Sequence, residues 1–357
     1  MPRLRTSVSA LTPYQAGRPI EEVARSLRLD PADLVKLASN ESPQPPFPEV
    51  VEAITAAASE INRYPDNDCY EPTRALAPLL GVGEDHILFG GGSSDLLRTI
   101  ALAVGGPGTT AVYPWPSFII YRVAPLLAGG DTVEVPLDGE LRHDLGAMLD
   151  AIRSDTTVVF LCNPNNPTGT YLAHSDVTSF IASVPPETLV VVDEAYFEYV
   201  TEPDYATAIP EAIARSNVVV LRTFSKIYGL AALRVGYAVG QPETLAGLRR
   251  AQGPFTVSSL AQVAAVEALK HPDRVAERCR LNRDERSRIE KELAARGVEY
   301  AASQTNFVYV RPTVGPSTAE LLKRGVIVRE MSDGFIRVTI GLPEENDRFL
   351  SALDEVS

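Results

Sequence analysis

Short runs of apolar, often β-branched residues recur through the middle of the chain, and helical patterns lie between most of them. The runs are at 110–113, 132–135, 157–162, 189–192, 217–221 and 235–239. Because most of them are apolar at nearly every position, they are typical of strands that are covered on both faces. With the right-handed crossovers that parallel strands require, they predict an α/β fold with three layers, α/β/α, around a mainly parallel sheet.

The N-terminal part of the chain follows a different pattern. Its first 45 residues contain one short helical pattern, at 20–27, and end in the proline-rich stretch 42–46. A second helical pattern covers 49–61. We therefore expect residues 1–40 to form an irregular arm that joins a smaller domain.

The pattern changes again after about residue 241. A long helical stretch over 260–295, broken near His271-Pro272, leads to short strands at 306–310, 326–329 and 335–340. Such strands with a closing helix are typical of a separate α+β domain. The sequence thus predicts three parts, namely the arm with part of the small domain (1–40), a large domain (41–245) and a small C-terminal domain (246–357).

Composition narrows the class of protein. The 357 residues carry a net charge of −13, and a nucleic acid or an anionic membrane would instead require a basic face. The N-terminus has no apolar signal core, no run is long enough to span a membrane, and the three cysteines are far apart, so we expect a cytoplasmic protein. The four histidines are isolated from one another and from the cysteines, which argues against a metal site.

Polar residues follow three of the predicted strands at the points where the strands end. Asn163–Gly169 follows one run, Asp193 follows the next, and Ser225-Lys226 comes shortly after the third. Taken singly, these could be a rigid turn, a helix N-cap and a surface lysine. The carboxyl ends of parallel strands, however, meet at one edge of the sheet, where ligands bind.

Together these residues match the needs of pyridoxal phosphate (PLP). A partly desolvated lysine such as Lys226 is nucleophilic toward an aldehyde, and a buried carboxylate such as Asp193 can pair with the pyridine nitrogen. The glycine-rich stretch 89–92 runs into Ser93 and an amphipathic helix, which puts free backbone N–H groups and a helix dipole against an anion. Ser225 and Arg234 can complete that phosphate site.

These motifs make the family recognisable. Asn163–Gly169, Asp193–Tyr196, Ser225-Lys226 and Leu233–Tyr237 resemble fold-type I PLP-dependent aminotransferases, in particular the histidinol-phosphate and aromatic aminotransferase group. The resemblance extends over nearly the whole chain, from the motif Leu37–Glu41 to Pro343–Asp347.

The resemblance implies a role for each cofactor residue. Lys226 carries PLP as a Schiff base and then moves the proton between the substrate α-carbon and the cofactor, while Asp193 pairs with the pyridine nitrogen. Asn166 and Tyr196 bind the ring oxygen, and Phe118 stacks on the ring. The phosphate is held by Gly92, Ser93, Ser94, Ser225 and Arg234, and by Tyr64 of the second chain of a homodimer.

The resemblance also implies substrate residues. Arg337 binds the anionic group of the substrate, and Tyr14, Asn40 and Arg329 complete its site.

Two departures from the family pattern affect the cofactor region. The phosphate loop differs from Gly-Asn-Gly-Ser-Asp-Glu at Gly91, Ser94 and Asp95, and Ala232 replaces a glycine before Leu233-Arg234.

The implied reaction is transamination between histidinol phosphate and the 2-oxo acid 2-oxoglutarate, giving imidazole acetol phosphate and glutamate. The stretches 62–67 and 115–118 resemble the aromatic branch instead, so phenylalanine or tyrosine is the alternative amino donor. A related specialised substrate and a PLP-dependent decarboxylase on the same scaffold also stay open. A PLP-sensing regulator is less favoured, because the chain has no basic DNA-binding segment and keeps Lys226.

Overall fold

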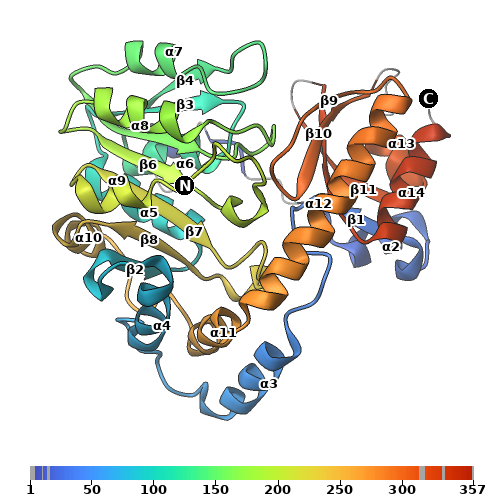
Figure 1. The fold of residues 1–357 in the computed structure, drawn as a ribbon, viewed down its shortest axis with the longest axis horizontal. Helices are drawn as coiled ribbons and strands as arrows, with labels where there is room; N and C mark the ends of the chain where they lie inside the picture. Colours follow the sequence, from blue (N-terminus) through green and yellow to red (C-terminus); the bar gives the residue numbers. More distant parts are fainter. Residues whose placement is uncertain (1–4, 10, 14–16, 313–317, 332–333, 356–357) are drawn as a thin grey trace.

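The computed structural model describes residues 5–9, 11–13, 17–312, 318–331 and 334–355, and it has two lobes (Figure 1). The larger lobe is built on a seven-stranded sheet and the smaller lobe on a five-stranded sheet. Within the described part of the chain, none of the helices combines the length and apolarity needed to cross a membrane.

The large sheet has the strand order β2-β8-β7-β6-β5-β3-β4. Neighbouring strands are parallel except for β8, which is antiparallel to both β2 and β7. This confirms the predicted mainly parallel sheet. The strands are β2 (Ile87–Gly90), β3 (Thr110–Trp115), β4 (Asp131–Pro136), β5 (Thr156–Cys162), β6 (Leu189–Asp193), β7 (Val218–Thr223) and β8 (Gly236–Gly240).

Alternate residues of the central strands enter two separate cores, one on each face of the sheet. In β5, Val159 and Leu161 belong to one core, while Val158 and Phe160 belong to the other. The first core is covered by α3 (Pro48–Ala57), α4 (Tyr70–Leu80), α7 (Leu145–Asp150), α8 (His174–Ser183), α9 (Ile209–Ala214) and α11 (Ser259–Leu269). The second is covered by α5 (Ser93–Val104), α6 (Ile120–Ala128) and α10 (Pro242–Arg249), which completes the three layers.

Two features of the large sheet differ from the sequence-based expectation. Strand β4 lies at the sheet edge and only its Val135 is buried, so the prediction that this run is covered on both faces is wrong. Strand β2 was not predicted, because its four residues run directly into the glycines of the phosphate loop.

The small lobe contains strands from both ends of the chain. Its sheet has the order β1-β11-β12-β10-β9, and β1 (Val35–Leu37) pairs in parallel with β11 (Val326–Glu330). The other strands are β9 (Glu299–Ala301), β10 (Phe307–Arg311) and β12 (Ile336–Thr339), and the helices that follow the large lobe are α12 (Pro272–Ala295), α13 (Thr318–Lys323) and α14 (Pro343–Asp354).

Short helical elements complete the described fold. They are α1 (Thr6–Ser9), α2 (Ile20–Leu27), η1 (Pro31–Asp33), η2 (Ala58–Glu60), η3 (Glu84–His86), η4 (Phe197–Tyr199) and η5 (Ala231–Leu233). The helix expected over 49–61 ends earlier, since α3 gives way to the η2 turn. Because α11 packs in the large-lobe core, we propose that the boundary between the lobes lies between α11 and α12, beyond residue 245.

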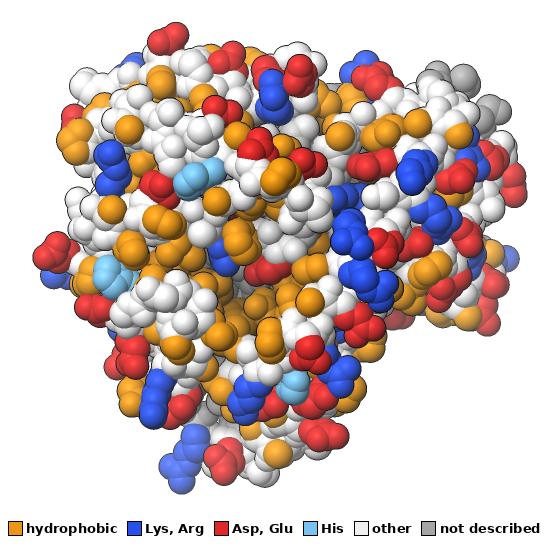
Figure 2. Space-filling model, in the orientation of Figure 1, with side chains coloured by type: hydrophobic (Ala, Val, Ile, Leu, Met, Phe, Trp, Pro, Cys, Tyr) orange, Lys and Arg blue, Asp and Glu red, His pale blue; other side chains and the backbone are white. Residues whose placement is uncertain are grey.

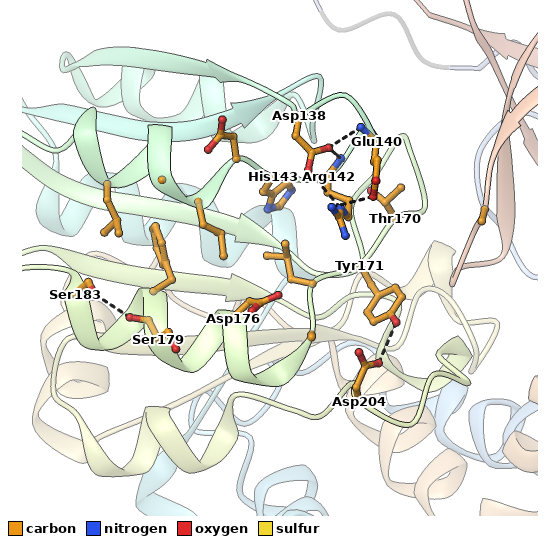
Figure 3. Close-up of a pocket in the computed structure, with 18 residues that line it drawn as sticks. Asp138, Glu140, Arg142, His143, Thr170, Tyr171, Asp176, Ser179, Ser183 and Asp204 are labelled. Carbon is orange, nitrogen blue, oxygen red and sulfur yellow. Dashed lines mark hydrogen bonds and ion pairs between the residues drawn. The ribbon is translucent and has the colours of Figure 1, made fainter.

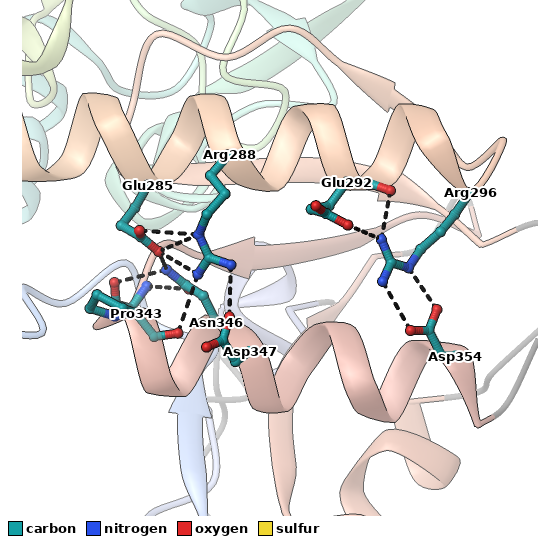
Figure 4. Close-up of polar contacts among 9 residues, drawn as sticks. Glu285, Arg288, Glu292, Arg296, Pro343, Asn346, Asp347 and Asp354 are labelled. Atoms are coloured by element: carbon teal, nitrogen blue, oxygen red, sulfur yellow. Dashed lines mark hydrogen bonds and ion pairs between the residues drawn. The ribbon is translucent and has the colours of Figure 1, made fainter.

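Ion pairs connect α12 to α14 across the outside of the small lobe (Figure 4). Arg288 contacts Glu285 and Asp347, each at 2.7 Å, and Arg296 contacts Glu292 and Asp354. These side chains are partly exposed, so each pair adds little to stability.

Charged side chains are dense over the small lobe, whereas apolar side chains line a hollow near the middle of the same face of the molecule (Figure 2).

Replacing Leu161 of β5 by alanine should destabilise the large lobe, because its side chain is fully buried in the core on one face of the sheet. We expect a loss of about 2–5 kcal/mol, since the cavity left behind cannot fully collapse. The matched control is Leu102→Ala on α5, where the side chain is 58% exposed and the change should stay within about 0.5 kcal/mol. Urea unfolding of the cofactor-free protein measures both, and equal midpoints for the two variants would contradict the assigned core.

Candidate active site

A cavity of about 310 Å³ lies at the edge of the large sheet where β5, β6 and β7 end. It is bounded by both lobes, since Arg337 on β12 and Asn40 after β1 also line it. The residues predicted from the sequence that line the cavity are Asn40, Ser93, Ser94, Phe118, Asn166, Asp193, Tyr196, Ser225, Lys226, Arg234 and Arg337.

Lys226 projects into this cavity from the loop after β7. Its Nζ donates a hydrogen bond to the carbonyl oxygen of Asn40 at 3.1 Å. Burial, reinforced by the positive charge of Arg337, lowers the pKa of Lys226 to about 8. At pH 7 roughly a tenth of this amine is therefore neutral, far more than for an ordinary lysine, and a neutral amine is both a nucleophile and a base.

Asp193 is the last residue of β6 and is only 2% exposed. Its carboxylate accepts hydrogen bonds from the Tyr121 hydroxyl at 2.8 Å and from the Ala195 amide at 3.2 Å. Burial raises the pKa of Asp193 to about 6, and these two hydrogen bonds oppose that rise. No helix begins at this residue, so the alternative interpretation as a helix N-cap does not apply.

Tyr196, Asn166 and Arg337 form a polar wall between the lobes. The Tyr196 hydroxyl accepts from the Asn40 amide at 2.9 Å, and burial raises the pKa of Tyr196, which keeps the phenol protonated. Arg337 donates to the Asn166 side-chain oxygen and, at 2.9 Å, to the carbonyl of Ala38. Asn40 adopts a left-handed backbone with φ of 53°, a conformation that is uncommon outside glycine and often found at functional sites.

The start of α5, where an anion site is predicted, lies beside Arg234. Gly92, with φ of 86°, precedes the helix. A side chain at this position would collide with Arg234, because a Cβ at Gly92 would lie 2.7 Å from the guanidinium. Gly236 is equally restricted, since a Cβ there would lie 2.9 Å from the Ser93 amide. Arg234 also reaches Ser225 Oγ at 3.4 Å. Glycine at these positions thus lets a cation and helix N–H groups approach one point.

Two residues that depart from the family pattern, Asp95 and Ala232, lie away from the cavity. Asp95 does not face the cavity, because its carboxylate accepts from the Gly91 amide at 2.9 Å and closes the loop on itself. Ala232 lies in η5 and does not line the cavity. The backbone donors at the helix start are therefore available despite the altered side chains.

Two further residues at the cavity were not recognised from the sequence. Tyr121 holds Asp193, stacks on Phe160 with ring centroids 5.0 Å apart, and meets Phe118 edge to face. Cys162 lines the cavity, and burial raises the pKa of its thiol to about 12, so the thiol is neutral. Both residue types fit an ordinary apolar pattern, and only the position of Cys162 at a strand end could have drawn attention to it.

Besides Gly92 at the start of α5, two other predicted residues, Tyr64 and Arg329, do not line the cavity. Tyr64 is 83% exposed and stacks on Phe255, with ring centroids 4.7 Å apart. Arg329 faces Arg337 across the β11–β12 pair but does not line the cavity. Tyr14 lies outside the described residues.

A second, larger cavity of about 940 Å³ lies over α7 and α8 (Figure 3). Its polar side chains are largely paired with one another, as in Asp138 with Arg142 and Tyr171 with Asp204. None of the residues predicted to bind cofactor or substrate lines it. The smaller cavity at the strand ends is therefore the candidate active site.

The donors around the smaller cavity fit PLP at each of its functional groups. A partly neutral lysine can bind the aldehyde, a buried carboxylate can face the ring nitrogen, and the α5 N-terminus with Arg234 can hold the phosphate. The fold and this site together define a fold-type I PLP-dependent enzyme.

Comparison with known proteins gives the family. The model of aminotransferase class I and II matches residues 32–353, and the chain belongs to this family. It is a PLP-dependent aminotransferase, which acts on amino and keto acid substrates.

Similar proteins come from two substrate groups. The histidinol-phosphate aminotransferase of Moorella thermoacetica is 42% identical over 100% of this chain and 93% of its own length. The aromatic amino acid aminotransferase of Thermobifida fusca is also 42% identical, over 98% of this chain and 96% of its own. The structure of histidinol-phosphate aminotransferase from Sinorhizobium meliloti in complex with pyridoxal-5'-phosphate has a TM-score of 0.90 at 30% identity, covering 100% of this chain and 98% of that one.

Replacing Lys226 by alanine should abolish covalent attachment of PLP, because no other lysine lines the cavity among the described residues. Borohydride treatment of the PLP-loaded wild type should add the mass of the reduced cofactor to the peptide that contains Lys226, and the variant should gain none. Lys270→Ala, a change at an exposed lysine, is the control and should label like the wild type. Labelling of the Lys226→Ala protein to a similar extent would contradict the assignment.

Proposed function

We propose that the chain transfers the amino group of histidinol phosphate to 2-oxoglutarate, giving imidazole acetol phosphate and glutamate. The observation that carries the proposal is its identity of 42–43% with histidinol-phosphate aminotransferases of several bacteria over 97–100% of this chain. Arg337 at the cavity supports it, since a guanidinium fork suits a carboxylate or a phosphate.

In this proposal Lys226 is the residue that moves the proton. When bound, PLP supplies an electron sink that makes the α-hydrogen of an attached amino substrate acidic. The Lys226 amine takes this proton from the substrate α-carbon, a role suited to a base whose pKa is lowered toward neutrality. Its hydrogen bond to the Asn40 carbonyl holds the amine at the cavity while it is free.

The remaining residues orient the cofactor and substrate. Asp193 pairs with the ring nitrogen, and Tyr196 and Asn166 hold the ring oxygen, with Tyr196 as a protonated phenol that can donate. Gly92, Ser93, Ser94, Ser225 and Arg234 hold the phosphate, and Phe118 packs on the ring. Arg337 and Asn40, which line the cavity, bind the substrate, and the family resemblance adds Arg329 and Tyr14 to them.

An aromatic amino acid is the second candidate donor. The relatives from Thermobifida fusca and Streptomyces coelicolor, 42% and 39% identical to this chain, are named aromatic amino acid aminotransferases. Phe118 and Arg337 suit this donor equally well, because an amino acid also brings a carboxylate for the guanidinium and an apolar side chain.

We also propose that the active form is a homodimer in which Tyr64 completes the phosphate site of the other chain. Large apolar side chains that are exposed gather in and near α3 and α4, namely Val51, Ile61, Tyr64, Tyr70, Leu79 and Phe255. Exposed apolar groups concentrated in one region are typical of a protein interface. The 83% exposure of Tyr64 fits a role outside its own chain.

The donor proposal is tested by kcat/KM for histidinol phosphate, phenylalanine, tyrosine and histidine with 2-oxoglutarate. We expect histidinol phosphate to lead by at least roughly tenfold, because its phosphate has more charge and more acceptor oxygens for the arginines of the site than the α-carboxylate of the amino acids has. Arg337→Lys should raise KM for it roughly tenfold through loss of the guanidinium fork, whereas Arg311→Lys at an exposed site should not. A preference for phenylalanine would exclude this donor and leave the aminotransferase class intact.

The dimer proposal is tested by mixing two inactive variants. Tyr64→Ala lacks the crossing tyrosine, and Lys226→Ala lacks the reacting amine. A mixed dimer has one site with both residues intact, so unfolding and refolding the two together should restore about a quarter of the wild-type sites. If the mixture shows only the sum of the two separate activities, Tyr64 does not act across an interface.

A further inference from the structure

An ion pair is buried directly behind the candidate active site. Glu194 and Arg222 lie at the ends of β6 and β7, and their side chains are 1% and 7% exposed. Arg222 Nη2 and Nε donate to Glu194 Oε2 at 2.8 and 3.0 Å. Neither residue lines the cavity, although their chain neighbours Asp193 and Thr223 do. Because successive side chains of a strand point to opposite faces, the pair is on the far side of the sheet from the cofactor site.

The pair joins three segments of the chain. Besides Arg222, Glu194 accepts from the Thr207 hydroxyl at 2.8 Å and from the Ala208 amide at 2.7 Å. The Arg222 guanidinium also lies 3.6 Å from the centre of the Phe197 ring. The pair therefore holds the segment 195–208, which contains Tyr196, at both ends. Arg222 contacts Phe197 near its start, and Glu194 accepts hydrogen bonds from Thr207 and Ala208 at its end.

The ionisable groups around the pair are mostly acids. Glu198 interacts with Arg222, and burial raises the pKa of Glu198 while the arginine opposes that rise. Tyr205, Tyr228 and Tyr237 also surround Arg222, and burial raises their pKa values, so their phenols are neutral. The negative charge of Glu194 adds to the burial that raises the pKa of Asp193, whereas Lys226 lowers it from the cavity side. Arg222 is thus the cation that balances Glu194 on the buried side of Asp193.

A buried ion pair seldom stabilises a fold more than apolar residues of the same volume do, so its presence here calls for another explanation. We infer that Glu194 and Arg222 are positioning residues for the cofactor, in that they fix Asp193 and Tyr196 in place and keep Asp193 anionic opposite the ring nitrogen. This inference rests on the proposed role of Asp193. Neither residue touches the cofactor, and the pair acts through the two strand ends.

The test is a charge series read at the ring nitrogen. Arg222→Met leaves Glu194 unbalanced, Glu194→Gln leaves Arg222 unbalanced, and the double variant is neutral. With PLP labelled by nitrogen-15 in the ring, the chemical shift reports whether the shared proton is on the ring or on Asp193. We expect Arg222→Met to move the shift toward the unprotonated ring and Glu194→Gln to move it the opposite way. The double variant restores the charge balance but not the hydrogen bonds of the pair, so its shift should be closer to that of the wild type than the shift of either single variant, without reaching it.

Cofactor affinity is the second measurement. Arg222→Met should weaken PLP binding about tenfold, because an unbalanced neighbouring charge shifts a pKa by about one unit or more. The double variant should recover most of this loss. If Arg222→Met does not fold, Glu194→Gln and the double variant still give different expectations, namely a shift toward the protonated ring for the first and a smaller change for the second. Shifts in the same direction for all variants, or no shift in any, would overturn the inference.

Two controls separate the possible failures. Arg288→Met removes an arginine from the α12–α14 ion pairs, far from the cavity, and should leave the ring-nitrogen shift unchanged (Figure 4). Asp193→Asn should give an unprotonated ring. If Asp193→Asn has no effect, the proposed role of Asp193 fails and the inference falls with it. If it has the expected effect but the charge series does not, only the role of the pair is wrong.

Discussion

The site depends on the register of three parallel strands. Cys162, Asp193 and Leu221 are partners in one row across β5, β6 and β7, so β5 and β6 end at the same level and β7 continues for two more residues. The next residues, Asn163 and Glu194, continue the row through backbone hydrogen bonds to Asp193 and Leu221. A shift of one residue in any of these strands would exchange its two faces, and in β6 it would turn the Asp193 carboxylate to the opposite face of the sheet. The cofactor chemistry is therefore inseparable from the packing of the sheet.

Much of this arrangement could be predicted from the sequence, because buried parallel strands leave a simple signal. The runs of β5, β6 and β7 consist almost entirely of apolar residues, so Asp193 and Lys226 are conspicuous as polar residues just beyond them. The signal is weaker at the sheet margins. Strand β4 contains Asp131 and Glu134, in keeping with its position at an edge, and β2 is too short and too close to glycines to be distinguished. The functional roles of the site residues remain predictions.

Other parts of the site could not be predicted, because they depend on contacts between distant segments. Tyr121 reads as one more apolar position of α6, and only its 2.8 Å contact with Asp193 reveals its place. The Glu194–Arg222 pair spans 28 residues of sequence and faces away from the cavity. Arg337 and Asn40 come from the small lobe, so the part of the site that meets the substrate is assembled only when the lobes come together. That assembly also explains why the amino donor is harder to infer than the cofactor.

The reversed direction of β8 has a further consequence. Because β8 is antiparallel to β7, Thr223 pairs with Gly236, and the connection between the two strands turns back at the cofactor edge without crossing the sheet. Lys226 and Arg234 both lie on this connection, so one loop carries the two groups proposed to bind the aldehyde and the phosphate of PLP. The distance between these two groups therefore depends on the length of a single loop. An insertion in a crossover elsewhere in the large lobe could extend into solvent, whereas an insertion here would move Lys226 relative to Arg234, and we expect this loop to tolerate changes of length poorly.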